Sequence, residues 1–72
     1  MPLKWKETAP GLLYEARGAG ERLFVIAFDG EHWTLDLFQD TEYAREQLAD
    51  PQPAPTLDAA KRMAHEWEAE LH

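Results

Sequence analysis

The chain has 72 residues, enough for one domain with a small core, so its stability must come from good packing or from self-association. It has no cysteine, which excludes disulfide bonds and thiolate metal sites. Fourteen acidic residues against seven basic ones give a formal net charge of −7, which argues against direct binding to nucleic acid. No apolar run has membrane-spanning length and the N-terminus lacks a signal-peptide pattern, so we expect a cytoplasmic protein.

The N-terminal third predicts two strands. Residues 3–7 alternate apolar and polar side chains, which indicates a short first strand. The Pro10-Gly11 pair marks a turn, and residues 12–17 predict the second strand. The Gly-Ala-Gly sequence at 18–20 is typical of a hairpin loop with a glycine in the left-handed conformation.

The central stretch predicts a second hairpin. Residues 21–28 and 31–38 are rich in β-branched and aromatic side chains and flank Asp29-Gly30. Asp-Gly is a strong signal for a two-residue hairpin turn, which would place Phe28 opposite Glu31.

Both predicted hairpins place the same side chains on one face of the sheet. A three-residue loop in the first hairpin would pair Arg17 with Glu21, and side chains alternate with a period of two. The predicted core face carries Leu12, Tyr14, Ala16, Phe24, Ile26, Phe28, Trp33, Leu35 and Leu37. The outer face is mixed and carries Leu13, Glu15, Arg17, Leu23, Val25, Ala27, His32, Thr34, Asp36 and Phe38.

The segment after the second hairpin has two interpretations. Asp40 or Thr41 can cap a short helix over residues 41–49, and the alternative is an ordered loop; we favour the helix. Residues 51–55 contain three prolines and cannot be helical, so we expect an extended strap across the end of the sheet.

The last element is predicted to be a helix over residues 57–71. Thr56 is a suitable N-cap, and Asp58 lies in the first turn, where negative charge suits the helix dipole. An apolar stripe recurs at spacings of three and four, formed by Leu57, Ala60, Ala64, Trp67 and Leu71. The sequence therefore predicts a single α+β domain over residues 1–72: a three- or four-stranded antiparallel β-meander with the C-terminal helix packed on one face.

The residues that carry enzyme chemistry are sparse. The chain has neither serine nor cysteine, and its carboxylates form no identifiable acid–base pair. His65, Glu68 and His72 share a helix face, but they are too few for a metal site. We therefore expect a protein that is not an enzyme and that uses neither a cofactor nor a metal.

The acidic residues give the leading functional hypothesis. Glu66, Glu68 and Glu70 occupy the end of the last helix, where the helix dipole favours cations. With Asp58, Glu42 and Glu46 they are the predicted partner-binding residues, and the expected partner is a basic protein surface. The competing interpretation is that the acidity only maintains solubility.

The outer sheet face suggests a second functional class. Its apolar members would form a binding or homodimer face if no other segment covered them. On this interpretation the chain is a structural or accessory protein that self-associates through that face.

The order of elements resembles small sheet-plus-helix proteins of phages and mobile elements, among them acidic anti-CRISPR proteins. The resemblance depends on Trp5, Tyr14, Phe24-Val25-Ile26, Asp29-Gly30, Trp33-Thr34-Leu35 and Ala60-Lys61-Arg62-Met63-Ala64. It implies a nucleic-acid mimic that inhibits a host nucleic-acid-binding defence complex. The insert at residues 39–55 departs from the simplest form of this layout.

Overall fold

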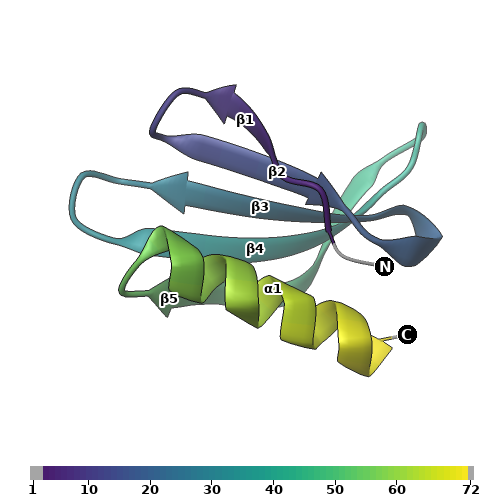
Figure 1. The fold of residues 1–72 in the computed structure, drawn as a ribbon. Coiled ribbons are helices and arrows are strands. Elements are labelled where there is room, and N and C mark those ends of the chain that lie inside the picture. Colours follow the sequence, from purple (N-terminus) through teal and green to yellow (C-terminus); the bar gives the residue numbers. More distant parts are fainter. Residues whose placement is uncertain (1–2, 72) are drawn as a thin grey trace.

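The computed structural model describes residues 3–71, which form a five-stranded antiparallel sheet with one C-terminal helix packed against it (Figure 1). The strands follow each other in the order of the chain, as a meander. The elements are β1 (Lys6–Ala9), β2 (Leu13–Arg17), a 3-10 turn (Ala19–Glu21), β3 (Arg22–Phe28), β4 (Trp33–Asp40), β5 (Arg45–Ala54) and α1 (Leu57–Leu71). The predicted α+β meander with a helix on one face is confirmed, but the sheet has one strand more than the four predicted at most.

The segment predicted as a helix over residues 41–49 forms a tight turn and the first half of β5 instead. Thr41 does cap a chain reversal, since its Oγ1 accepts hydrogen bonds from the backbone N–H groups of Tyr43 (3.3 Å) and Ala44 (3.2 Å). Its N–H also donates to the Ala44 carbonyl at 2.9 Å, which closes the turn between β4 and β5. A Thr followed by polar residues is as suitable for such a turn as for a helix cap.

The proline-rich stretch is also part of β5 rather than a separate strap. Pro53 lies opposite Thr34, and Ala54 lies opposite Trp33. Proline lacks the N–H that a central strand needs, but an edge strand has one side without a neighbour. Strand β5 occupies the edge of the sheet, so Pro51 and Pro53 are tolerated there and reduce its ability to accept a further strand.

Both hairpin loops are longer than predicted. Arg17 pairs with Leu23 rather than Glu21, and Phe28 pairs with Trp33 rather than Glu31. In the second loop, Asp29 Oδ1 accepts hydrogen bonds from the N–H groups of Glu31 (2.8 Å) and His32 (2.7 Å), which stabilises a wider turn than the predicted one.

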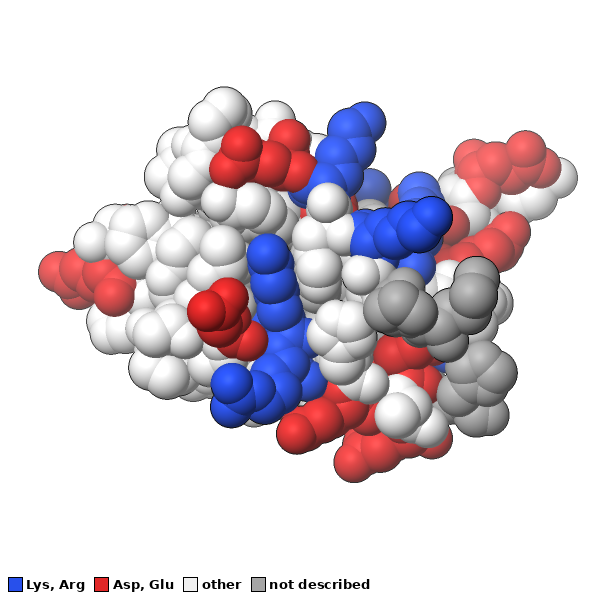
Figure 2. Space-filling view, viewed as in Figure 1, with Lys and Arg blue, Asp and Glu red and all other residues white. Residues whose placement is uncertain are grey.

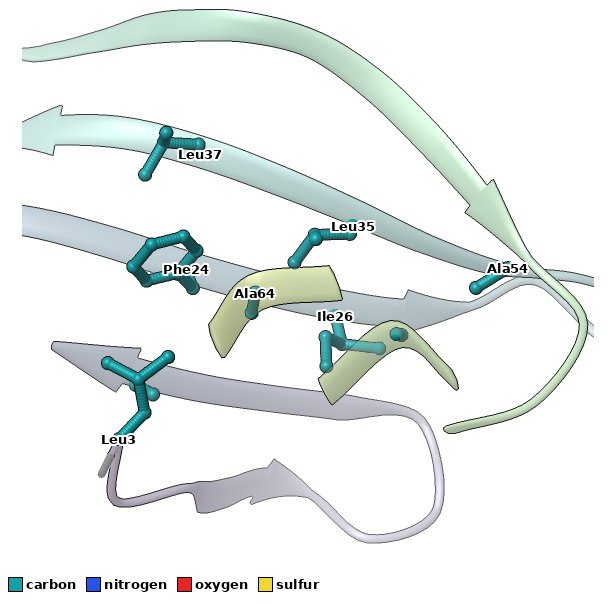
Figure 3. Close-up of a cluster of buried hydrophobic side chains, with 9 residues drawn as sticks. Leu3, Phe24, Ile26, Leu35, Leu37, Ala54 and Ala64 are labelled. Carbon is teal, nitrogen blue, oxygen red and sulfur yellow. The ribbon is translucent and has the colours of Figure 1, made fainter. Parts of the chain in front are cut away.

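Each register nevertheless differs from the predicted one by an even number of residues, so the paired side chains of β2, β3 and β4 keep their predicted faces. Phe24, Ile26 and Leu35 are fully buried, and Ala60 and Ala64 of α1 lie against them. Figure 3 shows the labelled core side chains between the sheet and the helix, with Leu3 closing one side.

Two predictions about the first two strands were wrong. Strand β1 begins at Lys6 rather than near residue 3, although Leu3 is buried in the core. Leu12, predicted on the core face, is 53% exposed because it lies in the turn before β2.

Helix α1 begins as predicted. The N–H of Ala59 donates to Thr56 Oγ1 at 3.0 Å, which confirms Thr56 as the N-cap. The helix packs across β3, β4 and β5, and the small Ala60 and Ala64 allow close approach. The side chain of Leu71 lies outside the described residues. Within residues 3–71, no helix has the length and apolar character that crossing a membrane requires.

Candidate functional site

Five of the six predicted partner-binding residues are exposed, namely Glu42, Glu46, Asp58, Glu66 and Glu70. They form no salt bridge with any of the residues that the structure describes. Figure 2 shows acidic atoms over the C-terminal part of α1 and at the turn between β4 and β5. Their charge is therefore directed to solvent.

The structure brings four of these residues toward one end of the molecule. Glu42 and Glu46 lie at and after the β4–β5 turn, and Glu66 and Glu70 lie in the last turns of α1 (Figure 1). Asp58 lies in the first turn of α1, at the opposite end of the helix. We call Glu42, Glu46, Glu66 and Glu70 the acidic end.

Glu68 does not belong to the exposed acidic surface predicted from the sequence. Only 7% of the residue is exposed. Its Oε1 accepts a hydrogen bond from Arg22 Nη2 at 2.5 Å, and its Oε2 accepts one from the N–H of Ala19 at 3.1 Å. Glu68 therefore links α1 to the loop between β2 and β3 through hydrogen bonds, and its carboxylate is not available to a binding partner.

Gly18 makes room for this carboxylate. A Cβ atom at position 18 would overlap Glu68 Oε2 and would lie 3.0 Å from Phe24 Cε2. The backbone of Gly18 is extended, so the absence of a side chain, rather than conformational freedom, is what the position requires. Gly20, next along the loop, has a φ of +65°, which confirms the predicted left-handed glycine.

A second cluster of charges surrounds Asp40 at the end of β4. Asp40 Oδ2 accepts a hydrogen bond from Arg17 Nη2 at 2.6 Å, and Oδ1 accepts one from Arg45 Nε at 3.1 Å. The Arg45 guanidinium also lies 5.5 Å from the centre of the Phe38 ring. Hydrogen bonds from Arg45 and Arg17 lower the pKa of Asp40 below its ordinary value.

This pKa gives a testable prediction. The Arg17→Gln/Arg45→Gln variant should raise the pKa of Asp40 toward the ordinary carboxyl value, because both charged donors are lost. In the parent, the pKa of Asp40 is lower in the folded protein than in the unfolded chain. The ionised carboxylate therefore stabilises the fold at pH values above the ordinary carboxyl pKa, and this stabilisation is lost as the pH falls through the lowered pKa. An NMR titration of the Asp40 carboxyl carbon measures both values. An equal pKa in parent and variant would contradict the pairing.

Basic residues from distant parts of the sequence line one groove next to this cluster. The groove has a volume of about 780 Å³. Its lining residues are Lys4, Lys6, Glu15, Ala16, Arg17, Gly18, Ala19, Leu23, Arg45 and Glu68. Figure 2 shows a group of basic atoms at the upper right, separate from the basic atoms that lie over α1. We call the groove lined by these ten residues the cationic groove.

The sequence did not predict the cationic groove, because its four basic residues come from positions 4 to 45 and show no local clustering. The useful signal was that alternation placed Arg17 and Leu23 on the same outer face, although their pairing was not predicted.

The structure gives no support for a metal site in the part of the chain that it describes. Residues 3–71 contain no group of three or more His, Cys, Asp or Glu side chains placed to hold a metal ion. His72, which shared a predicted helix face with His65 and Glu68, lies outside the described residues.

No known family model, curated protein or solved structure matches the chain significantly.

Proposed function

We propose that the chain is a non-enzymatic protein-binding module whose acidic end binds a basic surface of another protein. The observation that carries the proposal is the position of Glu42, Glu46, Glu66 and Glu70, exposed toward one end and without a salt bridge among the described residues. Carboxylates that are not neutralised within the chain create a field that attracts and orients a cationic partner.

The contrast between the buried Glu68 and the exposed Glu66 and Glu70 also supports this proposal. The last turns of α1 hold three glutamates, and the one that points inward has its own arginine. Glu66 and Glu70 have no arginine or lysine partner among residues 3–70 and lie where the dipole of α1 disfavours negative charge. Their charges oppose the helix dipole, which favours a role in binding.

The more specific form of the proposal follows the resemblance to phage and mobile-element proteins. A basic surface that normally holds nucleic acid would accept the acidic end in place of phosphates. The chain would then inhibit a nucleic-acid-binding defence complex of its host, as acidic anti-CRISPR proteins do.

A capture experiment tests the proposal. The parent and a Glu66→Lys/Glu70→Lys variant, each immobilised, are exposed to host lysate and eluted with a short duplex DNA. The parent should retain basic proteins that the duplex releases, and the variant should lose them, because repulsion replaces attraction. The matched control is Glu31→Lys/Asp50→Lys, which changes the net charge equally at exposed positions elsewhere.

The control should retain the captured proteins. Equal capture by the parent and by the Glu66→Lys/Glu70→Lys variant would contradict the proposal, and the acidity would then serve solubility.

Self-association through the outer sheet face is the second proposal. One observation favours it: α1 covers one face of the sheet, and Leu13, Ala27 and Thr34 on the other face remain partly exposed. However, Leu23 and Val25, two of the apolar residues expected there, are only 3% and 9% exposed within a single chain, and the Arg45 guanidinium lies over the ring of Phe38. Little apolar area therefore remains for a dimer contact, and the acidic end is the better supported site.

A further inference from the structure

We propose that the cationic groove binds a small phosphate monoester, with Arg17 and Arg45 as its principal ligands. This site uses other residues than the acidic end and has the opposite charge preference.

Two guanidinium groups converge on one carboxylate in this corner. Arg17 donates to Asp40 through Nη2 at 2.6 Å and to the Asp40 carbonyl through Nη1 at 3.3 Å. Arg45 donates to Asp40 through Nε alone. A guanidinium has five N–H donors, so both groups keep donors that no described residue uses. Planar forks of this kind favour the oxygens of carboxylates and phosphates.

The charge balance of the groove distinguishes between these anions. Lys4, Lys6, Arg17 and Arg45 are four of the seven basic residues in a chain with a net charge of −7. Asp40, which pairs with Arg17 and Arg45, and Glu15 of the lining oppose them, while Glu68, the other carboxylate of the lining, is paired with Arg22. Two positive charges therefore remain, which match a phosphate monoester with a charge of about −1.5 to −2 at pH 7.

The shape of the groove accounts for the organic part of the ligand. A volume of about 780 Å³ exceeds what inorganic phosphate needs and lies within the range of small-molecule sites. The exposed side chains of Lys4 and Lys6 also line it, and their aliphatic stems are apolar. A compact apolar or ring-shaped group can lie against these stems while the phosphate contacts the guanidinium groups.

An NMR titration tests the site with defined probes: inorganic phosphate, phenyl phosphate and succinate, each at constant ionic strength. Phenyl phosphate should give saturable shifts of the Arg17 and Arg45 Nε–H signals and of residues 15–19, with several-fold higher affinity than inorganic phosphate. Stronger binding of inorganic phosphate would remove the organic part of the proposal. Succinate binding as tightly as phenyl phosphate, or shifts that do not saturate, would overturn the phosphate assignment.

Matched variants separate the groove from total charge. Arg17→Gln/Arg45→Gln should lower the affinity for phenyl phosphate roughly tenfold or more, as expected when charge-assisted hydrogen bonds are lost. Lys61→Gln/Arg62→Gln removes two positive charges from α1 and should change the affinity less than twofold. Lys4→Gln/Lys6→Gln, which breaks no ion pair among the described residues, should also weaken binding. Equal losses in all three variants would overturn the proposal.

Removal of the competing carboxylate should have the opposite effect. Asp40→Asn frees Nη2 of Arg17 and Nε of Arg45 and removes a negative charge a few Å from the bound anion. The affinity for phenyl phosphate should increase roughly fivefold, the size expected for one unit charge about 4 Å away that is screened by bulk water. An unchanged or lower affinity in a folded Asp40→Asn variant would show that phosphate does not bind at these arginines.

Discussion

A Glu68→Lys variant should be largely unfolded at room temperature, whereas Glu66→Lys should melt close to the parent. The lysine would face Arg22 in a site where both side chains are mostly buried, and the N–H of Ala19 would lose its acceptor. Removal of one partner from a buried ion pair costs about 3–5 kcal/mol of unfolding free energy. The core of a domain of this size rarely supplies more than about 3–5 kcal/mol, so little stability would remain.

Circular dichroism during thermal unfolding measures this difference. Gly18→Ala provides a second variant with no change of charge, and it should lower the melting temperature because the added Cβ displaces the Glu68 carboxylate. Glu68→Lys melting within a few degrees of Glu66→Lys would show that the contact between Glu68, Arg22 and Ala19 does not hold the loop to α1.

A Phe24→Ala variant should lose about 3–5 kcal/mol of unfolding free energy, the range measured for large core aromatics. Phe24 is fully buried at the centre of β3, next to both β2 and β4 and beneath α1 (Figure 3). The cavity would lie where the small Ala64 cannot fill it. Urea unfolding followed by tryptophan fluorescence gives the free-energy difference.

Leu12→Ala is the control for this variant. Alternation placed Leu12 on the same core face, yet the residue is 53% exposed in the turn before β2. Its removal should change the unfolding free energy by less than about 0.5 kcal/mol, as at most surface positions. Similar losses from Phe24→Ala and Leu12→Ala would mean that the register of the first hairpin differs from the one described.

The faces of the sheet could be predicted from the sequence even though both loops were predicted too short. The period-two pattern is a property of each strand, and an even shift in pairing leaves it unchanged. Loop length depends on contacts that the local sequence does not reveal. The first loop is held by Glu68, about fifty residues away in the chain, and the second by the Asp29 side chain.

Strand β5 was missed because an edge strand lacks the signals of a central one. Seven of its ten residues are charged, polar or proline, and only Ala54 is fully buried. The same composition is typical of a loop or an exposed helix, and only the pairing with β4 shows that the segment is a strand. Glu68 was wrongly predicted to be exposed for a related reason. A charged residue on the buried stripe of α1 breaks the apolar pattern by which that stripe is recognised.

The candidate sites were predictable to different degrees. The exposed acids of α1 and of the β4–β5 turn followed from charge and position along the chain. The cationic groove did not, because the fold brings Lys4, Arg17 and Arg45 together from separate strands and from the N-terminal segment.

The division between an inward Glu68 and outward Glu66 and Glu70 is the central claim about function. The most direct measurement is the salt dependence of the association constant between the chain and its purified captured partner. For the parent, the constant should fall by about tenfold or more between 50 and 200 mM salt, because screening weakens exposed charges. The Glu66→Lys/Glu70→Lys variant should bind weakly at both salt concentrations while melting like the parent. A parent association constant that does not change with salt would contradict the claim.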